Sequence, residues 1–184
     1  MAAPNLPAPP PPSPAPPAAG PHGSSPPAPR SPGARLLATW RRARSFPLGG
    51  TLFMIALGRV VPYSAALGAR VISLEPGVVR LRLRDRRGVR NHLGSIHAIA
   101  LANLGELASG LAMTTALPPD MRSIVTALSV EFRKKARGTL MAESRVTLPS
   151  VSGDTDHDVH AVIRDDASDV VAVVTVRWRL RPSA

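Results

Sequence analysis

The sequence contains no cysteine. This absence excludes disulfide bonds, thiolate metal sites and a cysteine nucleophile together. It suits a reducing compartment, and we expect a cytoplasmic protein. The alternative is an organelle, because the basic amphipathic segment 35–44 has the pattern of a transit peptide. We favour a first helix docked on a core, with Leu36, Leu37 and Trp40 facing inward.

Long apolar runs and nucleotide-binding motifs are also missing. Thr51–Val61 is apolar but too short to cross a bilayer, and Arg59 interrupts it, so no membrane span is predicted. The sequence has no phosphate loop, no dinucleotide glycine fingerprint and no Gly-x-Ser-x-Gly. We therefore expect no cofactor.

Aromatic residues make up only 3% of the chain, whereas its formal net charge is +11. A positive field of this size recruits polyanions, which include nucleic acid, anionic lipid and the phosphates of coenzyme A. Stacking on single-stranded nucleic acid usually needs aromatic side chains, and no nucleic-acid motif is present. Nucleic acid is therefore the least favoured of these partners.

The composition divides the chain into two parts. Residues 1–33 are almost entirely Pro, Ala, Ser and Gly, which predicts a disordered polyproline-like tail because such a segment cannot recover its ordering entropy. Residues 34–184 are enough for one buried core. We expect residues 34–62 to form a helical extension of that single domain.

The hydrophobic periodicity predicts an α+β fold. Thr51–Val61 is a short helix that Pro62 ends, and Ile96–Ala116 is a long helix with Ser95 or Gly94 as its N-cap. The expected strands are Ala69–Leu74, Val79–Arg84, Ser123–Phe132, Gly138–Leu148, His157–Ile163 and Val170–Leu180. The first two make a hairpin and the last four a meander. One antiparallel sheet packed on one central helix is the economical architecture.

The long helix has two different faces. Leu101, Leu104, Ala108 and Leu111 form a core stripe. The opposite stripe is small and partly polar, and consists of Ile99, Asn103, Glu106, Ser109, Gly110 and Met113. A carboxylate in that setting loses solvation, and its pKa rises to suit a general base.

Two other charged groups have simpler interpretations. Alternation in the second strand places Leu81 and Leu83 inward and leaves the arginines of 80–84 on a solvated face. The run Asp154, Asp156, His157, Asp158 and His160 suggests a metal site, but it is a turn entering a strand and its spacing fits no standard ligand loop. We predict no metal.

Two sequence blocks carry a family resemblance. Asn91, Gly94 and His97 precede the long helix, and an acidic residue, Glu106, follows nine positions after the histidine. The second block, Phe132–Leu140, joins an aromatic residue, basic residues and an Ala-x-Gly turn. The pattern resembles the hot-dog-fold thioesterases, and most closely the uncharacterised DUF4442-like branch near the phenylacetate-pathway thioesterases. The resemblance covers about residues 69–180.

The resemblance implies a hot-dog fold and an acyl-thioester hydrolase acting on acyl-coenzyme A or an acyl-carrier thioester. Glu106 would activate water or attack the carbonyl directly. Backbone amides near Gly94 and Ala98 would receive the oxyanion, and Asn91 or His97 would orient substrate or water. The candidates for the coenzyme A phosphates are Arg133, Lys134, Lys135 and Arg137, with a solvated basic strand edge as the alternative.

Two features qualify this interpretation. Many relatives have His-Gly-Gly at the helix start, but this chain has His97-Ala98-Ile99, which favours a non-catalytic thioester-binding module as the alternative function. Nine helical residues also place His97 and Glu106 half a turn and about 13 Å apart. They cannot meet within one chain, so we expect a homodimer or homotetramer with shared sites.

Overall fold

The structure, a computed structural model, describes residues 31–183. The predicted tail therefore lies outside the described residues except for its last three positions. Helix α1 (Pro32–Ala43) already begins there, with the Ser31 hydroxyl accepting a hydrogen bond from the Ala34 amide at 3.1 Å. Leu37 and Trp40 are buried and Leu36 is half-buried, as expected of a docked first helix.

Two further helices complete the N-terminal region. Helix α2 (Gly49–Gly58) corresponds to the predicted short helix, and α3 (Pro62–Ala66) follows it. The expectation that Pro62 only ends a helix was incomplete, because this proline also starts α3. A proline fits the first helical turn, where its missing N–H would have no partner. No helix within residues 31–183 is both long and apolar enough to cross a membrane.

Within residues 31–183, six antiparallel strands form one sheet. They are β1 (Arg70–Glu75), β2 (Val78–Leu83), β3 (Met121–Phe132), β4 (Leu140–Arg145), β5 (Thr155–Arg164) and β6 (Val170–Pro182). Their order is β1-β2-β4-β5-β6-β3. The predicted four-strand meander is wrong at β3, which pairs with β6, while β4 pairs with the free side of β2. Local turn chemistry marks where strands end, but it does not decide which edge a returning strand fills.

The long helix α4 (Ala98–Ala116) begins two residues later than predicted. Its N-cap is His97, not Ser95 or Gly94, and the His97 Nδ1 accepts a hydrogen bond from the Ile99 amide at 3.1 Å. The helix cannot start earlier because Ile96 is in extended backbone, paired with Arg90.

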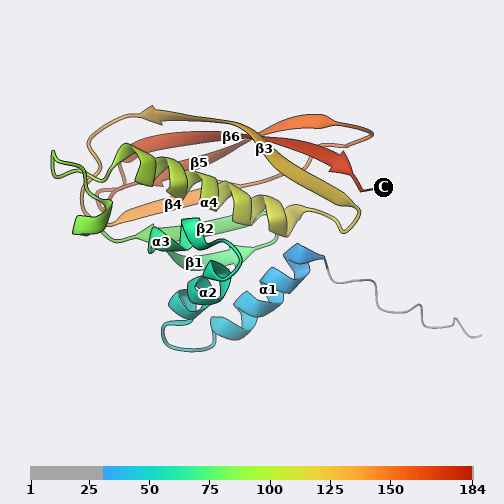
Figure 1. Cartoon of the computed structure of the whole chain (residues 1–184), viewed down its shortest axis with the longest axis horizontal. Coiled ribbons are helices and arrows are strands. Elements are labelled where there is room, and N and C mark those ends of the chain that lie inside the picture. Colours follow the sequence, from blue (N-terminus) through green and yellow to red (C-terminus); the bar gives the residue numbers. More distant parts are fainter. Residues whose placement is uncertain (1–30, 184) are drawn as a thin grey trace, which may run out of the picture.

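The sheet curves around α4, with β3 along one side of the helix and β1 along the other (Figure 1). The predicted core stripe of Leu101, Leu104, Ala108 and Leu111 is buried, with each side chain at most 5% exposed. Ser109 and Met113, which the helical wheel placed on the opposite stripe, are buried as well. A curved sheet covers more of a helix than one stripe.

Helix α4 packs very closely on β6 at Gly105. A Cβ atom on Gly105 would lie 2.3 Å from Cγ2 of Val174, closer than any real contact. A Cβ atom on Gly110, five residues further along, would lie 3.7 Å from its nearest neighbours, an ordinary contact distance. The separation of helix and sheet is therefore set at Gly105.

The two edges of the sheet differ. The start of α2 packs against the backbone of β1 so closely that a Cβ atom on Gly50 would lie 2.2 Å from the carbonyl oxygen of Val71. No other element of residues 31–183 pairs with the outer edge of β3. That strand also carries exposed Ile124, Leu128 and Phe132. A long apolar edge of this kind is prone to pair with another chain.

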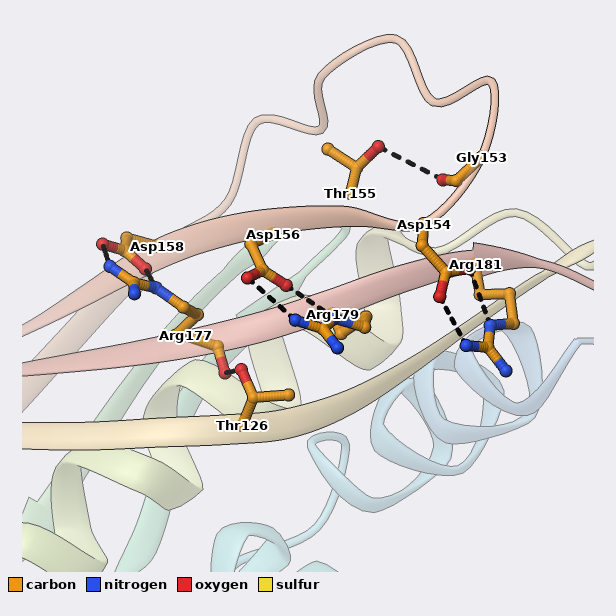
Figure 2. A network of polar contacts seen from close by, with 9 residues as sticks. All are labelled: Thr126, Gly153, Asp154, Thr155, Asp156, Asp158, Arg177, Arg179 and Arg181. Carbon is orange, nitrogen blue, oxygen red and sulfur yellow. Dashed lines mark hydrogen bonds and ion pairs between the residues drawn. The ribbon is translucent and has the colours of Figure 1, made fainter.

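Three Asp–Arg pairs cross from β5 to β6 (Figure 2). They account for the aspartates that suggest a metal site in the sequence, and are Asp154–Arg181, Asp156–Arg179 and Asp158–Arg177. Each arginine donates two hydrogen bonds to its aspartate, at 2.8 and 2.9 Å for Arg177 and Asp158. These hydrogen bonds lower the pKa of each aspartate carboxyl. The pairs reinforce the register of the two strands but are exposed, so each adds little stability.

We predict that Gly105→Ala destabilises the fold and that Gly110→Ala does not. The new methyl group at residue 105 must push α4 away from Val174, at a cost of about 1–3 kcal/mol. At residue 110 the methyl group has room, and the better helix propensity of alanine should stabilise by about 0.5–1 kcal/mol. Urea titration measures both changes as shifts in midpoint. Equal effects of the two substitutions would contradict this packing.

Candidate active site

The carboxylate of Glu106 lies in the wall of a cavity of about 610 Å³. The floor of the cavity is α4, which contributes Glu106, Gly110 and Thr114, one helical turn apart. The opposite wall comes from α1 and α2, and Trp178 of β6 closes one side. A Cβ atom on Gly110 would lie 3.7 Å from both Glu106 Oε1 and Trp178 Cη2, so these two side chains flank the glycine.

Burial raises the pKa of Glu106. The side chain is half-buried, and desolvation is the one cause of the shift. Within residues 31–183 the carboxylate accepts no hydrogen bond and pairs with no cation. A carboxylate that is desolvated and uncompensated is a stronger base than one in water, as the sequence predicted for this position.

The structure does not bring His97 to Glu106 within one chain. His97 caps α4 and borders a different cavity of about 360 Å³, together with Arg90 and Asn103. His97 and Glu106 therefore border different cavities, in agreement with the separation expected from helix geometry. The capping hydrogen bond from the Ile99 amide accounts for the Nδ1 atom of His97.

Asn91 and Gly94 organise the loop before α4. The Asn91 side-chain oxygen accepts hydrogen bonds from the amides of Leu93 and Ser95, at 3.0 and 3.1 Å. Gly94 has a φ of 67°, a left-handed conformation that glycine adopts without strain. Both residues therefore shape the loop that presents His97.

The two sequence blocks behind the family resemblance are in contact. The Ile96 amide donates a hydrogen bond to the carbonyl oxygen of Ala136 at 2.9 Å. Asp85 joins them a second time, since its carboxylate accepts hydrogen bonds from Arg90 at 2.6 Å and from the Gly138 amide at 3.1 Å. Ala98 lies exposed at the first position of α4 beside this junction.

The basic segment 133–137 divides into paired and unpaired cations. Arg133 pairs with Glu131, and Lys134 binds Asp165 and Asp169 at 2.8 and 2.7 Å. Lys135 and Arg137 are exposed and form no ion pair with another residue of 31–183. Of the four candidates for phosphate binding, these two have charge that is not already neutralised.

Sequence analysis missed the contribution of the N-terminal helices to the cavity around Glu106. Leu36 of α1 and Phe53, Ala56 and Leu57 of α2 all line it. One signal was present in the sequence: α2 has no polar face, so it offers apolar side chains to more than the core. Trp178, on a strand far along the chain, gave no such signal.

The chain is similar to known proteins in sequence and in fold. The sequence profile of a family described as a domain of unknown function (DUF4442) matches residues 49–180. A candidate esterase from Halobacterium salinarum is 34% identical over 85 residues, which are 44% of this chain and 56% of that protein. The match therefore spans about half the length of this curated relative.

Two solved structures extend the comparison. A structural-genomics protein is 26% identical, with a TM-score of 0.71 over 82% of this chain and 100% of its own. A Pseudomonas aeruginosa protein of unknown function, described as a candidate thioesterase, is 28% identical with a TM-score of 0.62, over 68% of this chain and 90% of its own. The hot-dog fold implied by the resemblance is confirmed.

We predict that Glu106→Gln stabilises the protein in a pH-dependent way. The folded-state pKa of Glu106 lies above its ordinary value of 4.5, so ionisation costs stability as pH rises through the folded pKa. Glutamine avoids that cost. The variant should therefore have the higher free energy of unfolding at neutral and mildly alkaline pH, and the difference should vanish below 4.5. Urea titrations of both proteins across pH measure it, and a pH-independent difference would contradict the desolvation of this carboxylate.

Proposed function

This chain belongs to the DUF4442 family, and from that premise we propose that it hydrolyses acyl thioesters with Glu106 as its catalytic carboxylate. One observation carries the proposal: an ionisable side chain without a partner among the described residues borders an apolar cavity large enough for an acyl group. Such a residue lowers the stability of the fold, and a role as general base would explain its presence there. The similarity to a candidate esterase and a candidate thioesterase supports the same class of reaction.

The reaction assigned to Glu106 is general-base hydrolysis. The carboxylate takes a proton from water, and the water oxygen forms a bond to the thioester carbonyl carbon. Amides at the start of α4, near Ala98, receive the resulting oxyanion. The C–S bond then breaks, the carbonyl re-forms, and the thiolate takes up a proton to leave as a thiol. Coenzyme A and an acyl-carrier protein both present such a thioester.

The active form in this proposal is a homodimer joined through β3. This edge strand is uncovered within residues 31–183 and exposes apolar side chains, whereas β1 is covered by α2. A second subunit would bring its own His97 and Ala98 toward Glu106, which one chain does not achieve. Lys135 and Arg137 follow β3 directly and would meet the coenzyme A phosphates from the same side. A homotetramer of such dimers, a cytoplasmic location and the absence of a cofactor stay predictions.

A thioester-binding module without turnover is the second candidate function. The observation in its favour is the pair Ala98 and Ile99, where many relatives carry glycines. In addition, the Ile99 amide is already occupied by His97 Nδ1 at 3.1 Å. A capped helix start offers fewer free amides to an oxyanion than an open one.

We predict that Glu106→Ala abolishes thioesterase activity. The assay is hydrolysis of short, medium, long and aromatic acyl-coenzyme A esters, and the loss in kcat should be about 100-fold or more because a general base contributes on that scale. Glu143→Ala is the matched control, since Glu143 is an exposed glutamate on β4 outside the cavity. Circular dichroism and size-exclusion chromatography verify the fold and assembly of both variants.

The outcomes separate the two functions. Hydrolysis by the wild type that collapses only in Glu106→Ala establishes the enzyme. Wild-type activity that survives Glu106→Ala refutes the role of this carboxylate. Binding of acyl-coenzyme A by calorimetry without any turnover identifies the binding module.

We further predict that Leu128→Lys disrupts the dimer. The leucine side chain is 42% exposed on the edge strand, and burying a lysine in a symmetric interface places two like charges together. Light scattering should show a monomer, with thioesterase activity lost in parallel. Ile72→Lys, an equally exposed position on the covered edge strand β1, is the control and should remain dimeric. A monomeric wild type would rule out a shared site.

A further inference from the structure

We propose that the space between α4 and the N-terminal helices is an acyl chamber that selects medium-chain acyl groups. The inference rests on the proposed function, because it takes the thioester carbonyl to lie at Glu106. It adds a binding site for the acyl tail, formed within a single chain by helices outside the sheet, and a length limit that this site imposes on the substrate.

The floor of the chamber gives it a direction. Glu106, Gly110 and Thr114 follow each other at intervals of four residues on α4, so they line one face of the helix. The eight residues from Glu106 to Thr114 span about 12 Å along the axis. Gly110 leaves the middle of this path open, since it has no side chain to fill the space between Glu106 and Trp178.

The opposite wall comes from α1 and α2 and is mostly apolar, although Thr39 also lines it. It contains Leu36 on α1 and Phe53 and Leu57 on α2. Arg35 also borders the chamber, and an arginine can lay its methylene groups on an apolar wall while its charged end stays in water. Glu106 is the only acidic group among the lining residues. An apolar channel with one carboxylate fits a hydrocarbon chain whose reactive end lies at that carboxylate.

The dimensions favour a medium chain. A fully extended peptide covers about 3.5 Å over three bonds, so about 12 Å corresponds to roughly ten bonds of an extended chain. The volume of about 610 Å³ lies in the range of small-molecule sites. Close packing anchors the far end, because a Cβ atom on Gly33 of α1 would lie 2.2 Å from the carbonyl oxygen of Thr114. An acyl chain much longer than ten carbons would therefore not fit inside the chamber.

The test fills the far end of the chamber. Thr114→Phe places a ring on the floor eight residues from the catalytic carboxylate, and Leu36→Trp fills the same end from α1 as an independent variant. The matched control is Thr147→Phe, the same substitution at an exposed threonine in the loop after β4. The measured quantity is the ratio of kcat/KM for decanoyl-coenzyme A to that for butyryl-coenzyme A.

The wild type should gain roughly fourfold in kcat/KM for each added methylene up to about ten carbons, and then no more. Thr114→Phe and Leu36→Trp should each lower the decanoyl-to-butyryl ratio about tenfold or more, which corresponds to two lost methylene sites or more. Thr147→Phe should keep the wild-type ratio. Glu106-dependent hydrolysis with an unchanged ratio in a folded Thr114→Phe or Leu36→Trp overturns the chamber and leaves the proposed function standing.

A binding measurement separates the chamber from catalysis. Decanoyl-coenzyme A is titrated by calorimetry into Glu106→Gln, with and without Thr114→Phe. Weaker binding in the double variant supports the chamber even if the wild type hydrolyses no thioester, in which case only the proposed function fails. Equal binding of decanoyl- and butyryl-coenzyme A by Glu106→Gln overturns the chamber.

Discussion

The contact between α4 and β6 at Gly105 sets the geometry on which the other parts of this structure depend. Because residue 105 has no side chain, the helix backbone approaches Val174 more closely than any other residue type would permit. The sheet can then curve around the helix and bury Ser109 and Met113 in addition to the leucine stripe. The Glu106–Gly110–Thr114 face of α4 borders the cavity of about 610 Å³.

The desolvated carboxylate of Glu106 lowers the stability of the fold. An exposed glutamate would not lower the stability of the fold, and the charge of a buried glutamate beside an arginine would be neutralised. Here desolvation raises the pKa without a compensating cation, although the chain carries 23 Lys and Arg residues. Several arginines are instead paired with aspartates elsewhere, as in the three Asp–Arg pairs between β5 and β6. Lys135 and Arg137 are exposed and form no ion pair with another residue of 31–183.

The N-terminal helices cover one edge of the sheet and also line the cavity around Glu106. The start of α2 covers the edge of β1, which leaves β3 as the uncovered edge within residues 31–183. Leu36 of α1, together with Phe53 and Leu57 of α2, lies on the apolar wall opposite α4. Because α2 is apolar around its whole circumference, it can pack on the core and still line a cavity. The expected "extension" is thus part of the candidate site.

The sequence by itself determined the elements and the chemistry of single residues. Periodicity located α4 and every strand, since side-chain alternation is a local property. The family pattern singled out Glu106, and its small apolar neighbours predicted the raised pKa. Only the tertiary structure decided the pairing of β3 with β6, the capping role of His97, and the joining of Leu36, Gly110 and Trp178 in one cavity. The strand pairing and the shared cavity depend on which surfaces meet after folding, because residues 40 or more positions apart carry no local signal of their contact. The cap falls at His97 because Ile96 before it is held in extended backbone, paired with Arg90.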